Sequence, residues 1–209
     1  MTTGYWRSAM RTQVIKRQAQ YEKRLSSILR NASKIIAREG FDGASIRTMA
    51  GQSRIGLSAI YYYFKNKDEL LYAIQHHAFS TLVNSLRERF KACDTPEEKL
   101  RAIIENHFQF FVENRDEFKV CVHEIDSLSG KYYKSILEIR QEYFRLVRQV
   151  VSEVLQNAHY EIDMATFFLF GSLNWVYMWY DPEKNADIQK VTTQFLRVFL
   201  NGKNRSKGL

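Results

Sequence analysis

The sequence is poor in proline, cysteine and glycine. Its 209 residues include only two prolines, two cysteines and nine glycines. The two cysteines, Cys93 and Cys121, allow at most one bridge, which excludes a disulfide scaffold. So few breakers leave long uninterrupted stretches, whereas a strand-rich protein needs many more turns. We therefore expect a mostly helical protein. No N-terminal segment resembles a secretory signal, so we expect the protein in the cytoplasm.

Positive charge is concentrated in the first third of the chain. Residues 1–70 carry thirteen Lys and Arg against five Asp and Glu, whereas residues 71–209 carry eighteen of each kind. The hydrophobic content of 45% is sufficient for a packed core. This charge distribution is typical of a protein in which one domain binds a polyanion and the other has a different role. The alternative interpretation is that the basic residues form a solvated tail.

Apolar periodicity and helix-end signals predict about nine helices. Apolar residues recur at three- and four-residue steps from Tyr21 to Glu39, and Gly40 follows as the terminating residue. Ser45 is placed to cap a short helix that begins at Ile46. The remaining helices are expected over 57–64, 68–90, 96–113, 116–128 (ended by Gly130), 131–158, 162–180 and 186–200. The first twenty residues show no sustained apolar face, which predicts a basic arm.

One segment approaches the length needed to span a membrane. Residues 162–180 are mostly apolar over nineteen positions. They include Asp163 and Asn174, and their aromatic residues crowd the second half instead of flanking an aliphatic centre. We therefore expect a helix buried between other helices or between subunits, and no membrane partner.

The two short helices lie within a longer signature, which reads DGASIRTMAG and then LSAIYYYFKNKDELL. The spacing is that of a helix-turn-helix. The whole run, from about Leu25 to Ile74, resembles the tetracycline-repressor (TetR) family of one-component transcriptional regulators. The resemblance implies an all-α fold. A basic arm (1–20) would precede a three-helix DNA-binding domain (21–70), and a helical domain for ligand binding and dimerisation (71–209) would follow.

The turn of this motif departs from the family pattern. The family usually has Ala-Gly-Val-Ser-x-Gly, whereas this chain has Ser-Arg-Ile-Gly-Leu-Ser at residues 53–58. Arg54 adds a charge beside the expected DNA surface, and Ser58 adds a hydrogen-bond donor. The operator preference therefore cannot be carried over from relatives.

The second short helix supplies most of the expected DNA contacts. Its periodicity places Leu57 with Ile60 and Phe64 on a buried face and points Tyr62 outward. Phenol and ammonium groups are expected to contact phosphates, and the resemblance places Arg47 where it would read a base. A tyrosine cluster that only packs in the core is the alternative. The expected DNA-binding residues are Ser45, Arg47, Arg54, Leu57, Ser58, Tyr61, Tyr62, Tyr63, Lys65 and Lys67.

The resemblance also implies a dimer. In the family, the last two long helices of each subunit form a four-helix bundle, and here these would be residues 161–180 and 184–201. Small residues in an apolar helix let a partner backbone approach, and a homodimer matches a palindromic operator. Packing within one subunit is the alternative. The expected interface residues are Phe168, Gly171, Ser172, Trp175, Phe195 and Phe199.

Aromatic residues with basic neighbours are frequent in the second part of the chain. An apolar cavity with basic edges suits a lipophilic tail with an anionic head. The run LFGSLNWVYMWYDP resembles a helix of TetR-family members that sense fatty acyl-CoA, which implies such an effector and target genes of fatty-acid breakdown. Ordinary core and dimer packing is the alternative. The expected ligand-binding residues are Phe108, Phe111, Tyr133, Tyr143, Phe144, Phe170, Trp175, Trp179, Arg140 and Arg148.

Other functions remain open from the sequence. A drug- or aromatic-responsive repressor of an efflux system would hold flat cations with carboxylates, for which Glu105, Glu124, Asp126 and Glu142 are candidates. A helical lipid-handling protein would prefer anionic vesicles to specific DNA. An architectural DNA-binding protein would not respond to small molecules.

Catalysis and metal binding find no support in the sequence. It has no glycine-rich phosphate loop, nucleophile elbow or HExxH motif, and His107, Cys121, His123 and Glu124 lack the short spacing of metal-ligand pairs. We therefore predict a homodimeric repressor that is not an enzyme and needs no cofactor or metal. It would bind double-stranded DNA at a palindromic operator and leave it when a small hydrophobic or amphipathic ligand, such as long-chain fatty acyl-CoA, binds.

Overall fold

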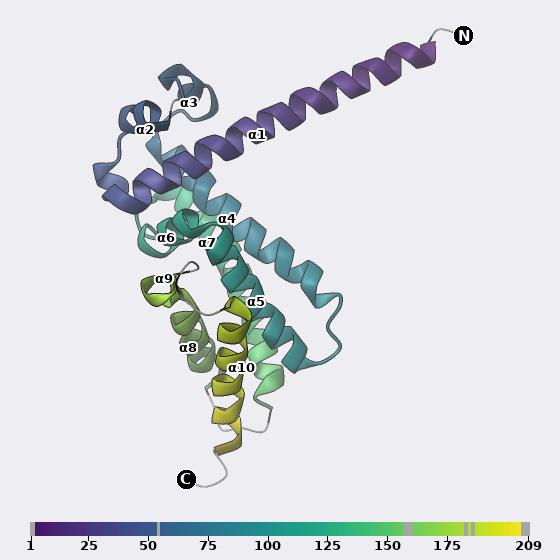
Figure 1. The fold of residues 1–209 in the computed structure, drawn as a ribbon, viewed down its shortest axis with the longest axis vertical. Coiled ribbons are helices and arrows are strands. Elements are labelled where there is room, and N and C mark those ends of the chain that lie inside the picture. Colours follow the sequence, from purple (N-terminus) through teal and green to yellow (C-terminus); the bar gives the residue numbers. More distant parts are fainter. Residues whose placement is uncertain (1–2, 54, 157–160, 182–183, 185–186, 206–209) are drawn as a thin grey trace. The chain divides into compact units, whose positions relative to one another are not determined.

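The computed structural model describes residues 3–53, 55–156, 161–181, 184 and 187–205. Every regular element in these ranges is a helix, which confirms the predicted all-α fold (Figure 1). The chain divides into two compact units after Ile74. The helix α4 (Lys67–Phe90) contributes residues to both units.

The first unit contains α1 (Thr3–Gly43), α2 (Ile46–Ser53), α3 (Leu57–Tyr63) and the first turns of α4. Helix α1 packs on α2, and α2 packs on α3. Its core consists of apolar residues at the predicted helical spacing: Ile28, Leu29, Ala32, Ile35, Ile36, Met49, Ala50, Ile60 and Phe64, all buried. Burial of these stripes fixes the short helices α2 and α3, which are too short to be stable alone.

The predicted helix ends around the first turn are confirmed. Gly40 has φ 76° and ψ 161°, a conformation that only glycine adopts readily, and it interrupts the helical backbone of α1. The Ser45 hydroxyl then accepts a hydrogen bond from the Thr48 N–H at 3.0 Å and so caps α2.

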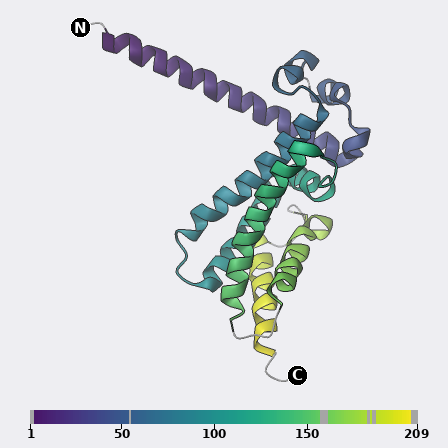
Figure 2. The ribbon, with the colours of Figure 1, turned by 180° about the vertical axis from the view of Figure 1, so that it is seen from behind.

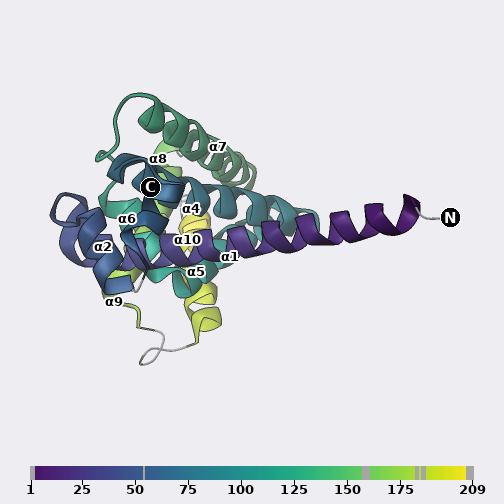
Figure 3. The same cartoon turned by 90° about the horizontal axis from the view of Figure 1, so that it is seen from above.

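The expected arm differs from the structure, because α1 already begins at Thr3 and continues without a break into the packed part of the helix (Figures 1 and 3). Residues 13–20 are all exposed. The search for an apolar face missed this helix, since a segment that extends an existing helix needs no nucleation and no packing of its own. The hydrogen bond from Gln18 to Glu22, one helical turn away, adds local support.

The second unit is arranged around α5 (Pro96–Glu113). This helix packs against α6 (Arg115–His123), α7 (Gly130–Val154), α8 (Ile162–Asn174) and α10 (Ile188–Arg205), and Figure 2 shows these helices from behind. The short helix α9 (Val176–Trp179) follows α8. Thr95 and Glu98 form a capping box at the start of α5, with Pro96 in the first turn, as the sequence predicted.

Several helix boundaries differ from the prediction. Helix α7 ends at Val154, and its predicted end at Ala158 lies outside the described residues. Helix α6 ends at His123, and Gly130 (φ 57°) begins α7 instead of ending the preceding helix. The apolar run predicted as one helix is broken at Trp175, between α8 and α9. Helix α10 begins at Ile188 and continues past Gly202 to Arg205, while the predicted start at Ala186 lies outside the described residues. Among the described residues, no helix is long and apolar enough to cross a membrane.

An ion pair joins α4 to α6 in the second unit. His77 Nδ1 lies 3.1 Å from an oxygen of the buried Glu117 carboxylate. The hydrogen bond to Glu117 raises the pKa of His77 above its ordinary value of 6.5, burial opposes the shift, and the Glu117 charge supports it. Because the pKa of His77 is raised in the folded state, the His77–Glu117 pair contributes its full stabilisation of the fold below pH 6.5. This contribution is lost as the pH rises through the raised pKa.

We therefore expect Glu117→Gln to flatten the dependence of stability on pH on the alkaline side of 6.5. The midpoint of urea unfolding should fall with rising pH in the native protein and fall much less in the variant. The matched control is Glu88→Gln, which alters an exposed carboxylate paired with a lysine. An equal fall in Glu117→Gln and the native protein would show that the pair does not contribute.

Candidate DNA-binding surface and effector cavity

The DNA-binding surface is expected on α3 and its flanks. Ile60 and Phe64 are buried, as predicted, and hold α3 on the first unit. Leu57, which the periodicity placed with them, is 36% exposed, because it is the first residue of α3 and has no preceding turn to cover it. Ser58 is exposed beside it.

The three tyrosines of α3 lie in different environments. Tyr62 is 77% exposed and Tyr61 is 53% exposed, so both hydroxyls are accessible to a polyanion. Tyr63 is half-buried, and its ring lies 4.9 Å from that of Tyr21 on α1 and 5.1 Å from that of Tyr62. Tyr63 thus joins α3 to α1, a contact that the sequence analysis did not predict.

Lys67 is already engaged within the unit. Its ammonium group donates a hydrogen bond of 2.8 Å to the Phe41 carbonyl oxygen and lies 4.2 Å from the centre of the Phe41 ring. These contacts fix the start of α4 against the turn that follows Gly40. The exposed Lys65 side chain is therefore the better candidate for a phosphate contact next to α3.

The remaining predicted DNA contacts lie on or beside α2. Arg47 is exposed on the first turn of α2, and Ser45, also exposed, holds the cap of that helix. Arg54 lies outside the described residues. Their roles in DNA binding stay predictions.

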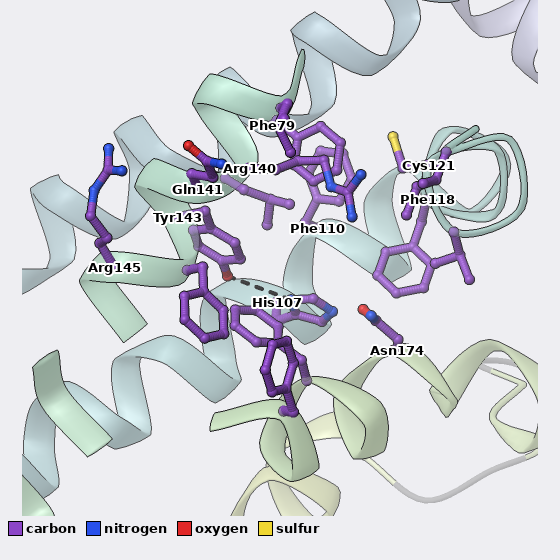
Figure 4. A pocket seen from close by; sticks show the side chains of 17 residues that line it. Phe79, His107, Phe110, Phe118, Cys121, Arg140, Gln141, Tyr143, Arg145 and Asn174 are labelled. Atoms are coloured by element: carbon purple, nitrogen blue, oxygen red, sulfur yellow. Dashed lines mark hydrogen bonds between the residues drawn. The ribbon is translucent and has the colours of Figure 1, made fainter. Parts of the chain in front are cut away.

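The second unit contains a cavity of about 550 Å³, which is in the range of small-molecule sites. Five helices and the turn after α6 line it (Figure 4). The lining residues are Phe79 and Leu82 from α4, His107 and Phe110 from α5, Phe118, Cys121 and Val122 from α6, Ile125 from the turn, Leu137, Arg140, Gln141, Tyr143, Phe144 and Arg145 from α7, and Phe167, Phe170 and Asn174 from α8. Most of this surface is apolar or aromatic.

Four of the ten predicted ligand residues lie in this lining: Arg140, Tyr143, Phe144 and Phe170. The rings of Phe144 and Phe170 are 6.0 Å apart, and Phe170 also lies 5.6 Å from Tyr143. Helices α7 and α8 thus form an aromatic wall.

The other six predicted ligand residues do not line the cavity. Phe108 and Phe111 are fully buried in the core, because α5 turns about 100° per residue and presents His107 and Phe110 to the cavity instead. Arg148 pairs with Asp163. Tyr133 is half-buried near the start of α7, while Trp175 and Trp179 are 59% and 46% exposed.

The predicted interface residues divide into two groups. Phe168 (71% exposed) and Trp175 point to solvent, and Gly171 and Ser172 are exposed between them. Phe195 and Phe199 are half-buried against the core of their own unit, and the Phe195 ring lies 5.0 Å from that of Phe108. Internal packing therefore accounts for much of the second group.

Arg140 is the basic residue that extends across the cavity, over the Phe79 ring, whereas Arg145 points away at its edge (Figure 4). Neither arginine forms an ion pair with a carboxylate in the described part of the chain. The described lining also contains no Asp or Glu. A positive charge in an apolar site without its own counter-ion favours an anionic ligand.

The predicted list of ligand-binding residues included none from α4 or α6, and His107 was considered only as a metal candidate. The buried His107 belongs to the lining, together with Asn174 from α8. The only signal in the sequence for these two residues was a polar residue on the apolar face of its helix, α5 for His107 and α8 for Asn174.

The four residues considered for a metal do not converge: among the described residues, no three His, Cys, Asp or Glu side chains gather in a metal-binding arrangement.

Comparison with known proteins assigns both units. Residues 28–74 match the family described as "Bacterial regulatory proteins, tetR family", and residues 93–203 match "Tetracyclin repressor-like, C-terminal domain". The chain belongs to the TetR family. This TetR-family protein is accordingly a transcriptional regulator, and the resemblance inferred from the helix-turn-helix signature is confirmed.

Similar proteins extend over most of this TetR-family chain. The "Fatty acid metabolism regulator protein" of Bacillus subtilis (strain 168) is 22% identical, with 88% of this chain and 97% of that protein covered. The TetR-family regulator PfmR of Thermus thermophilus has a TM-score of 0.74 and 24% identity, covering 83% of this chain and 97% of its own. AibR, solved with isovaleryl coenzyme A and operator DNA, has a TM-score of 0.76 and 21% identity, covering 85% of this chain and 98% of its own. These structures share the fold.

We expect Lys65→Ala and Arg47→Ala to affect DNA binding in different ways. Loss of a phosphate contact at Lys65 should weaken binding equally on all sequences and reduce the salt slope by about one. Loss of a base contact at Arg47 should remove about 1–3 kcal/mol of discrimination at one base pair per half-site. Salt-dependent anisotropy titrations on a set of operator variants measure both.

The control for this pair is Lys91→Ala, an exposed lysine of the second unit. It should change neither quantity. Unchanged preference at every base pair in Arg47→Ala would remove that residue from base recognition.

Proposed function

We propose that this TetR-family regulator is a homodimeric repressor that binds a palindromic operator through α3 and is released by a fatty acyl-CoA. The observation that carries the proposal is the apolar cavity crossed by Arg140 and free of carboxylates in its described lining. An acyl chain would fill the aromatic part. The anionic head group would lie on the side of Arg140 and Arg145. The regulated genes would be those of fatty-acid metabolism.

The distribution of carboxylates speaks against a cationic drug as the effector. None of the four candidate carboxylates is in the described cavity lining. Glu105 lies 3.9 Å from both Arg89 and Arg101, and Glu142 pairs with Arg87. Glu124 and Asp126 flank the lining residue Ile125. A buried organic cation would therefore lack a counter-charge, which is costly in an apolar site. The efflux-repressor alternative loses its main physical support.

Helix α4 offers a route from the cavity to DNA. Phe79 and Leu82 line the cavity, and residues 67–74 of the same helix belong to the first unit. A ligand that presses on Phe79 would favour one position of α4 over another. Such a ligand shifts the equilibrium between DNA-binding and released states only by its difference in affinity for the two.

Two similar proteins agree with an acyl-CoA effector. The Bacillus subtilis relative is named for fatty acid metabolism, and AibR was solved with isovaleryl coenzyme A and operator DNA. Both are about a fifth identical to this chain, so they support the class of effector and leave its chain length open.

Palmitoyl-CoA should release the protein from an operator selected from random DNA, and CoA alone should not. Leu137→Trp, which fills the cavity from α7, should retain DNA binding and lose the response. The matched control is Val112→Trp on the exposed face of α5. Anisotropy of labelled operator measures release. Release of Leu137→Trp at the native concentration of palmitoyl-CoA would place the effector elsewhere.

An exposed apolar surface supports the dimer. Met164, Phe167, Phe168, Trp175 and Met178 on α8 and α9 are each more than half exposed. Patches of this kind mark interaction surfaces. A second copy of the chain is the proposed occupant, since a two-fold operator requires a two-fold protein.

Gly171→Glu should yield monomers in sedimentation. A Cβ atom at Gly171 meets no other atom within 4 Å in the single chain, and the position is exposed, so the substitution should not disturb the fold of the subunit. A carboxylate buried in the dimer would lack a partner and oppose association. Asn84→Glu, at an exposed position of α4, is the control and should remain dimeric. A dimer of Gly171→Glu as tight as the native one would move the interface elsewhere.

A further inference from the structure

His107 is the most unusual polar residue of the cavity. It is only 3% exposed, and its ring is surrounded by those of Phe118, Tyr143 and Phe170 at centre distances of 5.3, 6.4 and 6.4 Å. Its Nδ1 lies 3.5 Å from the Tyr143 hydroxyl, the contact drawn in Figure 4. No described residue meets its buried Nε2 with full hydrogen-bond geometry.

Packing does not explain this arrangement. Phenylalanine would fill the same space among aromatic rings without a polar atom, and buried polar groups without a partner are rare in folded proteins. Burial lowers the pKa of His107 to about 4, and a side-chain hydrogen bond with Asn174 opposes this shift to a smaller extent, so the ring is neutral at pH 7. It is therefore no counter-ion for a head group and acts only through hydrogen bonds.

Asn174 adds a second polar group at the same place. It comes from the last turn of α8, lines the cavity, and its carboxamide faces the His107 ring across the space between α5 and α8 (Figure 4). A carboxamide both donates and accepts, and neutral imidazole nitrogen does one or the other according to its tautomer. Together, the two side chains match an oxygen atom that lies between them.

We propose that His107 and Asn174 bind an oxygen on the hydrocarbon chain of the effector, so that the natural ligand is a hydroxy- or oxo-acyl thioester and not a saturated one. This inference rests on the proposed acyl-CoA function and narrows its substrate class. The aromatic wall holds the chain, Arg140 lies on the side of the anionic head, and the His107–Asn174 pair reads the chain substituent. A saturated chain would offer neither polar group a hydrogen bond.

The expected preference for an oxygenated chain follows from the cost of covering polar groups without giving them hydrogen bonds. An oxygenated chain makes hydrogen bonds that the saturated chain cannot, and a site with buried polar groups rejects a ligand that leaves them unpaired. We expect oxygenated chains to bind about 10-fold more tightly than a saturated chain of equal length.

The test compares palmitoyl-CoA with derivatives of the same length that carry a hydroxyl or keto group at C3 or at mid-chain. Binding to the full-length protein is measured by calorimetry. The variants are His107→Phe and Asn174→Leu, each of which replaces a polar group by an apolar one of similar volume, and thermal unfolding checks that they fold. Val112→Ala is the control, because Val112 lies on the exposed face of α5 outside the described lining and the change removes no polar atom.

The native protein and Val112→Ala should prefer at least one oxygenated chain about 10-fold, and the preference should fall to about 1-fold in each folded polar variant. Equal binding of all chains by the native protein would overturn the inference and leave the acyl-CoA function intact. So would a preference that persists in His107→Phe and Asn174→Leu. Failure of every acyl-CoA to bind would refute the proposed function, and the inference with it.

Discussion

Burial of α5 determines the arrangement of the second unit. This helix buries nine of its 18 residues, and α6, α7, α8 and α10 all pack against it. Its Phe108 face forms the solid core, while its His107 face is left against the cavity. The same helix thus supplies both part of the core of the unit and a polar group of the cavity lining.

Charge separates the tasks of the two units. The first unit exposes basic and phenolic side chains beside α3, which suits a polyanion. In the second unit, the Arg140 side chain lies over the Phe79 ring in the lining of an apolar cavity. Helix α4 begins in the first unit, and its residues Phe79 and Leu82 line the cavity of the second unit.

Much of this architecture could be predicted from the sequence, because it depends on local rules. Gly40, the Ser45 cap and the Thr95–Glu98 capping box each determine a helix end through a few neighbouring atoms. The family resemblance rested on a contiguous signature, so it did not depend on tertiary structure.

The cavity lining could be predicted only in part, since it depends on the rotation of five helices about their axes. Phe108 and His107 are adjacent in sequence and lie on different faces of α5. Counting aromatics selected Phe108 and passed over His107, because composition carries no information about which face meets the cavity. The break between α8 and α9 at Trp175 could not be predicted either, because the apolar run contains no local signal for it.

Hydrogen exchange with and without palmitoyl-CoA tests the central claim most directly. The account predicts slower exchange in α5, α7 and α8 around the cavity, together with a change in α4 that extends into residues 67–74, at the concentration that releases DNA. Release of DNA with no change in the segments that line the cavity would contradict it.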